Sequence, residues 1–157
     1  MANPLYDALL APLEGRTKPF LILPDGTEIS GDSFLQISAR QAYVLAAFGV
    51  APGDRVAVQV SKTPQALALY AACVALGAVF LPLNTAYTAA EVGYFLADAR
   101  PAVFVCDPGR MADLVPVAAG AQLLTLDAAG QGSLTDASAD KPGHFAPVDR
   151  SGSDLAA

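Results

Sequence analysis

Short apolar runs recur along this chain and alternate with longer segments of helix-favouring sequence. The apolar runs predict buried strands at 55–60, 78–81, 102–106 and 122–126. The segments between them predict helices at 63–76, 88–99 and 108–119. Because nearly continuous apolar strands are separated by helices, we expect an α/β fold with a mostly parallel sheet and helices on both faces.

Three elements precede this repeat. Residues 4–13 predict a short amphipathic helix, and residues 20–30 predict a hairpin whose turn is Asp25-Gly26. A longer helix follows, capped at its start by Ser30 and ended by Gly49 in a left-handed conformation. Its apolar residues recur at three- and four-residue steps or their sums: Phe34, Ile37, Val44, Leu45 and Phe48.

Threonine and aspartate residues mark the starts of the later helices. Thr63 precedes Pro64, which takes the first helical position, where its missing N–H costs nothing. Thr88 and Glu91 form a capping box, in which each side chain accepts a backbone N–H at the helix start. Asp107, followed by a proline, repeats the first arrangement. These residues set the predicted starts of all three helices.

The uncharged stretch 66–83 approaches the length of a membrane span. Gly77 divides it, and the residues before this glycine favour helix while the "AVFLPL" after it favours strand. We therefore expect a buried helix followed by a buried strand rather than a membrane helix.

The last part of the chain is small and polar in composition. The stretch 130–137 offers one helical turn, and Ser138–Gly152 is interpreted as a linker or surface loop. The expected division is therefore an α/β unit at 1–137 and a loop or linker at 138–157.

Composition narrows the class of protein. Hydrophobic residues make up 54% of the chain and charged residues 15%, which supports a large core and argues against disorder. The net charge is −6 and the basic residues are scattered, which disfavours nucleic acid as a partner. The N-terminus lacks the basic and apolar regions of a secretory signal. Cys73 and Cys106 lie in apolar runs and are interpreted as inert core thiols, which fits a cytoplasmic location.

The sequence contains no complete motif for phosphate binding, metal binding or nucleophilic catalysis. No G-x-G-x-x-G follows a strand, and the glycine-rich turn Gly130–Ser133 lacks the lysine and spacing of a phosphate loop, so a plain turn is expected. His144 is the only histidine; we expect a solvated loop residue, with a catalytic base as the alternative. Ser33 and Ser153, without a G-x-S-x-G elbow, are expected in polar loops or helix starts.

Lys62 is the most plausible ligand contact, because it follows strand 55–60 at the edge where ligands of parallel sheets bind. Solvation at the helix start is the simpler interpretation. Tyr87 is expected to pack on the sheet edge, with substrate binding as the alternative. Asn84 is expected to bond its own turn backbone, and Asp54 to be a turn residue rather than a cation partner. The residues alone assign no catalytic, cofactor-binding or metal-binding position.

The region 49–108 resembles the N-terminal region of the AMP-forming acyl-CoA synthetases, members of the adenylate-forming superfamily. The matching positions follow the superfamily's pattern of turns, strand ends and helix starts: Gly49, Gly53, Asp54, Val56, Gly77, Pro82, Leu83, Asn84, Tyr87, Glu91 and Tyr94. Within the superfamily, residues 81–108 together with "GSLTDA" at 132–137 look most like malonyl-CoA synthetases. The resemblance extends over residues 4–157.

The resemblance implies a large N-terminal domain, of which this chain would be the first subdomain, and a small mobile C-terminal domain. It implies that a carboxylic acid reacts with Mg·ATP to give an acyl-adenylate and pyrophosphate, and that CoA then displaces AMP. It also places the family's phosphate-binding loop, adenine, Mg²⁺ and acid sites and catalytic lysine after residue 157. No catalytic residue is therefore carried over, and the fragment alone is expected to need no cofactor.

The expected function is that of the N-terminal part of an acid–CoA ligase, with malonate as the acid. Two alternatives stay open: a fatty- or aryl-acid–CoA ligase of the same superfamily, and a stand-alone, non-catalytic binding module. The ending in "SDLAA", where a strand is expected to begin, argues against the module. The chain alone is expected to be inactive, and uncovered sheet edge and apolar surface would allow self-association.

Overall fold

A four-stranded parallel sheet forms the centre of the protein, as seen in a computed structural model that describes residues 2–157. Its strands have the order β4-β3-β5-β6, and the register places Val56 beside Phe80 on one side and Val103 on the other. The strands are β3 (Arg55–Gln59), β4 (Val79–Pro82), β5 (Val103–Cys106) and β6 (Gln122–Thr125). All four coincide within a residue or two with the predicted runs, and the α/β prediction is confirmed.

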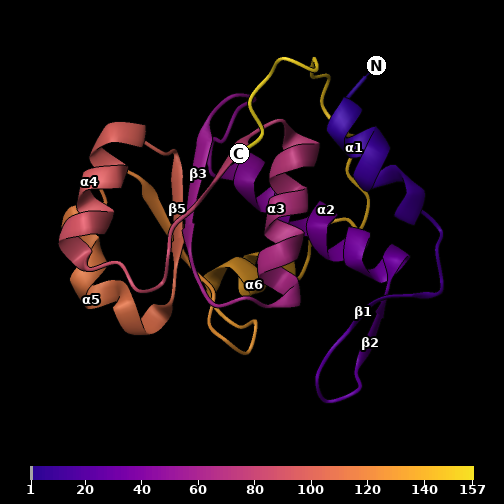
Figure 1. Ribbon diagram of the computed structural model, residues 1–157, viewed down its shortest axis with the longest axis horizontal. Coiled ribbons are helices and arrows are strands. Elements are labelled where there is room, and N and C mark those ends of the chain that lie inside the picture. Colours follow the sequence, from indigo (N-terminus) through magenta and orange to yellow (C-terminus); the bar gives the residue numbers. More distant parts are fainter. Residues whose placement is uncertain (1) are drawn as a thin grey trace.

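Helices cover both faces of this sheet (Figure 1). One face carries α2 (Gly31–Ala47), α3 (Pro64–Leu76) and α6 (Ser133–Ser138), and the other carries α4 (Ala89–Ala99) and α5 (Met111–Leu114). The central strand β3 therefore sends alternate side chains into two cores. Val56 and Val58 belong to the core beneath α2 and α3, whereas Ala57 belongs to the core beneath α4 and α5.

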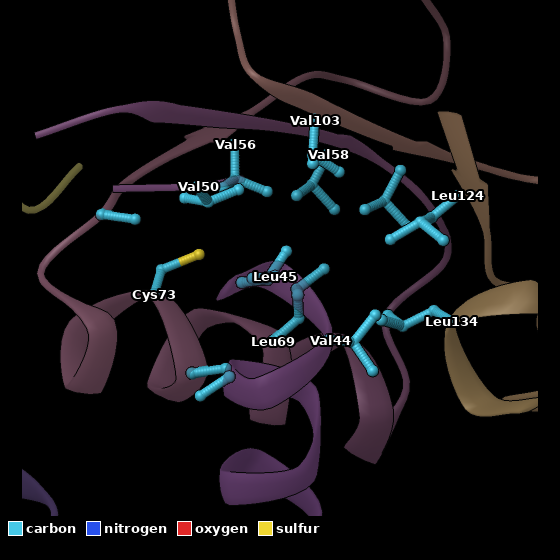
Figure 2. Close-up of a cluster of buried hydrophobic side chains, with 14 of the residues drawn as sticks. Val44, Leu45, Val50, Val56, Val58, Leu69, Cys73, Val103, Leu124 and Leu134 are labelled. Carbon is cyan, nitrogen blue, oxygen red and sulfur yellow. The ribbon is translucent and has the colours of Figure 1, made fainter. Parts of the chain in front are cut away.

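The larger core is built from aliphatic side chains of the sheet and of α2 and α3. Figure 2 shows Val56 and Val58 facing Leu45, Leu69 and Cys73 across this layer. Leu45, Leu69, Val56 and Cys73 are completely buried. Complete burial of one such aliphatic side chain contributes about 1.5–3 kcal/mol relative to exposure, so this layer is a main source of stability.

Helices α2 and α3 begin where their predicted capping residues lie, and α3 ends at the predicted glycine. The Ser30 hydroxyl accepts from the Ser33 N–H at 3.1 Å, and the Thr63 hydroxyl accepts from the Ala66 N–H at 3.1 Å. Helix α3 ends at Gly77 with φ of 75°, and β4 follows two residues later. The stretch 66–83 is thus a buried helix followed by a strand, and no helix within residues 2–157 is long and apolar enough to cross a membrane.

The predicted helix at 108–119 is broken into three short pieces. They are the 3₁₀ turn η2 (Pro108–Arg110), α5, and the 3₁₀ turn η3 (Val115–Val117). The break between α5 and η3 follows from Pro116, which has no N–H to donate to the carbonyl four residues earlier and disfavours helical geometry in the residue before it. The prediction of one continuous helix was wrong for this reason.

The N-terminal elements pack outside this sandwich. Helix α1 (Pro4–Leu9) is followed by the 3₁₀ turn η1 (Ala11–Leu13), so the single helix predicted at 4–13 is divided. Strands β1 (Pro19–Ile22) and β2 (Glu28–Ser30) form the predicted hairpin as a separate two-stranded antiparallel sheet. Gly26 takes a φ of 86° at its turn, a conformation that glycine adopts without strain.

Residues 139–157 have no regular secondary structure. They are nevertheless held by the rest of the chain. The Val148 N–H donates to the Ala75 carbonyl at 2.8 Å, and the Arg150 N–H donates to the Ala2 carbonyl at 2.7 Å. The Phe80 N–H on the outer edge of β4 donates to the Ala156 carbonyl at 2.9 Å.

The capping box of α4 is a testable source of stability. The Thr88 hydroxyl accepts from the Glu91 N–H at 3.3 Å, and the Glu91 carboxylate accepts from the Thr88 N–H at 2.8 Å. Thr88→Ala removes one acceptor, and we expect it to lower the free energy of unfolding by about 1 kcal/mol in urea titrations followed by circular dichroism. The control is Thr85→Ala in the exposed turn just before, which should change it by less than about 0.5 kcal/mol. Equal losses in the two variants would contradict this role.

Candidate functional site

The carboxyl edge of the sheet contains a point where the chain leaves two neighbouring strands in opposite directions. After β3 the chain passes to α3 on one face, and after β5 it passes to α5 on the other. In open parallel sheets, ligands bind in the crevice that such diverging connections leave. The candidate site is therefore the β3–β5 edge, defined here as Gln59, Lys62, Asn84, Tyr87 and Arg110.

Gln59 is the buried centre of this edge. It is the last residue of β3 and is 2% exposed. Its Nε2 donates to the Asn84 carbonyl at 2.8 Å and to the Tyr87 carbonyl at 3.3 Å. Both carbonyls belong to the turn between β4 and α4, so Gln59 holds that turn against the end of β3.

Arg110 reaches across the same edge from the turn that follows β5. Its guanidinium donates to the Gln59 Oε1 and to the Tyr87 carbonyl, both at 3.4 Å. These bonds are long and therefore weak. Arg110 is half-buried and forms no ion pair with a carboxylate of residues 2–157. A guanidinium has five donors, so Arg110 retains capacity to bind a phosphate or carboxylate group in bidentate fashion.

Lys62 lies at the same edge, directly before the Thr63 cap of α3. It is exposed, and within the described chain its ammonium group makes no hydrogen bond or ion pair. The solvated position agrees with the simpler interpretation from sequence. Its place beside the β3 exit also leaves it available to an anionic ligand, so its role as a contact stays a prediction.

Asn84, Tyr87 and Asp54 behave as the sequence predicts. The Asn84 side chain accepts from the Ala86 N–H at 2.9 Å and so stabilises its own turn. Tyr87 is half-buried and stacks on Phe95, with ring centroids 5.3 Å apart. Asp54 accepts from the Ala51 N–H at 2.8 Å, as a turn residue does.

The glycine-rich turn Gly130–Ser133 uses three of its four backbone N–H groups internally. The N–H groups of Gly130 and Gln131 donate to Asp127, and the Ser133 N–H donates to the Thr125 hydroxyl at 2.9 Å. A phosphate loop needs free N–H groups that point at the ligand. This turn therefore closes the end of β6, as the plain-turn interpretation predicts.

The remaining sequence candidates do not assemble into a catalytic group. His144 is exposed in the loop after α6, Ser33 lies in the first turn of α2, and the Ser153 hydroxyl contacts that of Ser151. Complete burial raises the pKa of the Cys73 thiol far above its usual range. Burial and then the negative charge of Asp107 raise the pKa of the Cys106 thiol to about 11. Both thiols are therefore protonated and unreactive at neutral pH, as predicted.

Metal ligands are also dispersed. Within residues 2–157 no group of three or more histidine, cysteine, aspartate or glutamate side chains is placed to hold a metal ion. The chemistry that the described residues support is thus the binding of an anionic group at the β3–β5 edge. Sequence reasoning missed Gln59 and Arg110. Two features of the sequence could have indicated them. Gln59 is a polar residue at the end of an apolar strand, and Arg110 follows the strand that pairs with it.

Comparison with known proteins gives one family. The model of the AMP-binding enzyme family matches residues 13–157. A feruloyl-CoA synthase from Amycolatopsis is 38% identical over 117 residues, which are 74% of this chain and 23% of that protein. The apo structure of MatB from Rhodopseudomonas palustris is 42% identical with a TM-score of 0.94, covering 99% of this chain and 32% of that one. The acyl-CoA synthetase of Brucella canis is 27% identical with a TM-score of 0.76, covering 85% and 26%. The chain thus spans about a quarter to a third of the length of these relatives.

Arg110 provides a direct test of anion binding at the β3–β5 edge. We expect pyrophosphate to cause saturable shifts of the Gly109 and Lys62 amide resonances, with binding that weakens as NaCl is added. Arg110→Ala should weaken the binding roughly tenfold, because charge-assisted hydrogen bonds are lost.

The matched control is Arg16→Ala. Arg16 is exposed in the segment between η1 and β1, which contributes no residue to this edge. The change removes the same charge without touching the proposed site. Unchanged affinity in Arg110→Ala, or an equal loss in both variants, would show that the edge is not the anion site.

Proposed function

The chain belongs to the AMP-binding enzyme family, and from that membership we propose that it forms the N-terminal part of an ATP-dependent acid–CoA ligase whose acid is malonate. The observation that carries the proposal is the similarity to MatB in sequence and in fold. MatB is 42% identical over 99% of this chain, with a TM-score of 0.94. Malonate itself rests on the malonyl-CoA synthetase-like segments 81–108 and 132–137.

The proposed reaction has two steps. A carboxylate oxygen of malonate attacks the α-phosphorus of ATP, which forms malonyl-adenylate and releases pyrophosphate. The thiolate of CoA then attacks the acyl carbon and displaces AMP, which leaves malonyl-CoA. A structure of MatB with ATP bound, 42% identical to this chain, supports ATP as the nucleotide substrate.

Residues 2–157 contribute binding and support rather than bond making. They do not fit a Mg²⁺ site, because their carboxylates are not grouped for one. In our proposal the ATP and metal chemistry is therefore carried by other parts of the enzyme. Arg110 and Lys62 would receive an anionic portion of a substrate at the β3–β5 edge. Gln59 would keep the Arg110 guanidinium oriented through its Oε1.

Two other functions have specific support. Feruloyl-CoA synthase is 38% identical over 117 residues, which favours an aryl acid as the substrate. The long-chain-fatty-acid–CoA ligase FadD13 of Mycobacterium tuberculosis is 38% identical over 69 residues, which favours a fatty acid. A non-catalytic binding module is the remaining alternative.

The two free, buried cysteines fit a reducing compartment, and we propose the cytoplasm as the location.

Acid preference tests the malonate proposal. With the complete gene product that contains residues 1–157, ATP, Mg²⁺ and CoA, we expect malonate to drive AMP release at least roughly tenfold more efficiently than ferulate or octanoate, measured as kcat/KM. Preference for ferulate or octanoate would overturn malonate and support the corresponding alternative. AMP release that no acid stimulates would overturn the ligase itself.

The 157-residue chain gives a second test. Because residues 2–157 do not form a phosphate loop or a metal site, we predict no sustained AMP release when the chain is incubated alone with ATP, Mg²⁺, malonate and CoA. The control is a reaction blank without protein, read by chromatography of the nucleotides. AMP formation clearly above the blank would contradict the proposal that the chemistry is carried elsewhere.

A further inference from the structure

Ala2 and Asn3 connect the start of the described chain to its last part. The Ala2 N–H donates to the Asp149 carboxylate at 2.7 Å, and the Ala2 carbonyl accepts from the Arg150 N–H at 2.7 Å. We call Ala2 and Asn3 the N-terminal clasp, and residues 148–156 the C-terminal segment. Figure 1 shows this segment, in yellow, passing beside α1 before it ends next to the sheet.

Asn3 uses its whole side-chain amide in this contact. It is 5% exposed, and its Nδ2 donates to the Val74 carbonyl of α3 at 2.9 Å and to the Val148 carbonyl at 3.1 Å. Its Oδ1 accepts from the Tyr6 N–H at 3.2 Å and caps α1. One buried amide therefore joins α1, the last turn of α3 and the C-terminal segment.

The C-terminal segment runs alongside β4 in the same direction as that strand. Arg150 passes over Gly77, where an added Cβ would lie 2.8 Å from the Arg150 Cδ. Further along, the Ala156 carbonyl accepts from the Phe80 N–H at 2.9 Å. Later residues of the segment thus meet later residues of the β4 region. The segment therefore points toward the carboxyl edge of the sheet, where the β3–β5 edge lies.

The outer edge of β4 is a weak anchor for this segment. The N–H groups of Val79 and Leu83 point inward to β3, and Pro82 has no N–H. The Phe80 N–H is therefore the donor that this edge offers, and Ala156 takes it. One hydrogen bond stabilises by no more than the entropic cost of ordering a single residue. The edge alone does not hold nine residues in place, so their order depends on the contacts at 148–150.

We propose that the N-terminal clasp is a strap that keeps the C-terminal segment on β4, so that the Phe80–Ala156 pairing depends on Asn3. Asn3 contacts Val148 and not Ala156, so this dependence is transmitted through the segment. In the ligase proposed above, on which this step rests, the segment directs the following chain toward the β3–β5 edge. Asn3 is then a positioning residue that touches no substrate.

Amide hydrogen exchange of the 157-residue chain tests the strap. If the segment opens as one unit, the Val148 and Phe80 amides should exchange with the same opening constant in the unaltered chain, and faster than the Val105 amide in the buried strand β5. Asn3→Ser keeps an oxygen that can cap α1 but removes both amide donors. We expect it to accelerate Val148 and Phe80 by the same factor, at least about tenfold.

Two references separate release of the segment from general loosening. The Leu23 amide bonds Thr27 within the exposed hairpin, which opens without the clasp, so its exchange should not change. Asn84→Ser, the same substitution in the turn after β4, should leave the Val148 and Phe80 rates unchanged. If Asn3→Ser accelerates Val148 but not Phe80, or if Phe80 is as slow as Val105 in the unaltered chain, the strap proposal is wrong.

Kinetics of the complete gene product test the positioning role. We expect Asn3→Ser to lower kcat roughly tenfold and to change KM for ATP and the acid less than about twofold, because misplaced parts weaken the transition state more than substrate binding. Equal kcat in an active parent enzyme and in Asn3→Ser would overturn the positioning role. A parent enzyme without acid-stimulated AMP release would instead overturn the ligase function, and hydrogen exchange would then decide the strap by itself.

Discussion

Burial of β3 on both faces is the constraint from which the rest of the architecture follows. Val56 and Ala57 are completely buried although they point to opposite faces. The backbone of β3 must also be paired on both sides, which β4 and β5 accomplish. Right-handed connections to strands on either side then require helices on opposite faces. The divergence of the chain after β3 and β5 is a consequence of this arrangement.

Gln59 is the polar exception in that buried strand, and the candidate site depends on it. An amide buried to 2% exposure destabilises the fold unless its donors and acceptor are bonded. Its donors are satisfied by the turn after β4, and its acceptor by the guanidinium that follows β5. One buried side chain thus connects the exits of three strands. Arg110 contacts Gln59 only through a long bond and has no carboxylate partner within residues 2–157, so the cation remains available to a ligand.

Local signals in the sequence predicted much of the fold. Thr88 with Glu91, Thr63 with Pro64, and Ser30 each began a helix as expected, because a cap involves groups only three residues apart. Gly77 divided helix from strand for the same local reason. The failure at 108–119 was also local: the effect of Pro116 on the helix was underestimated.

The contacts that sequence could not predict are non-local. Gln59 meets Arg110 only because β3 and β5, 51 residues apart along the chain at these positions, are neighbours in the sheet. The groove between α1, α2 and the loop at 143–145 likewise brings together segments that no periodicity relates. The segment 139–157 gives a further case. Its composition excludes helix and strand, but its position is determined by the end of α3, whose last carbonyls lack donors within the helix. The Val148 N–H satisfies the Ala75 carbonyl, and the Asn3 side chain bridges the Val74 and Val148 carbonyls. A segment without regular structure is therefore ordered by the requirements of a helix that precedes it by some seventy residues.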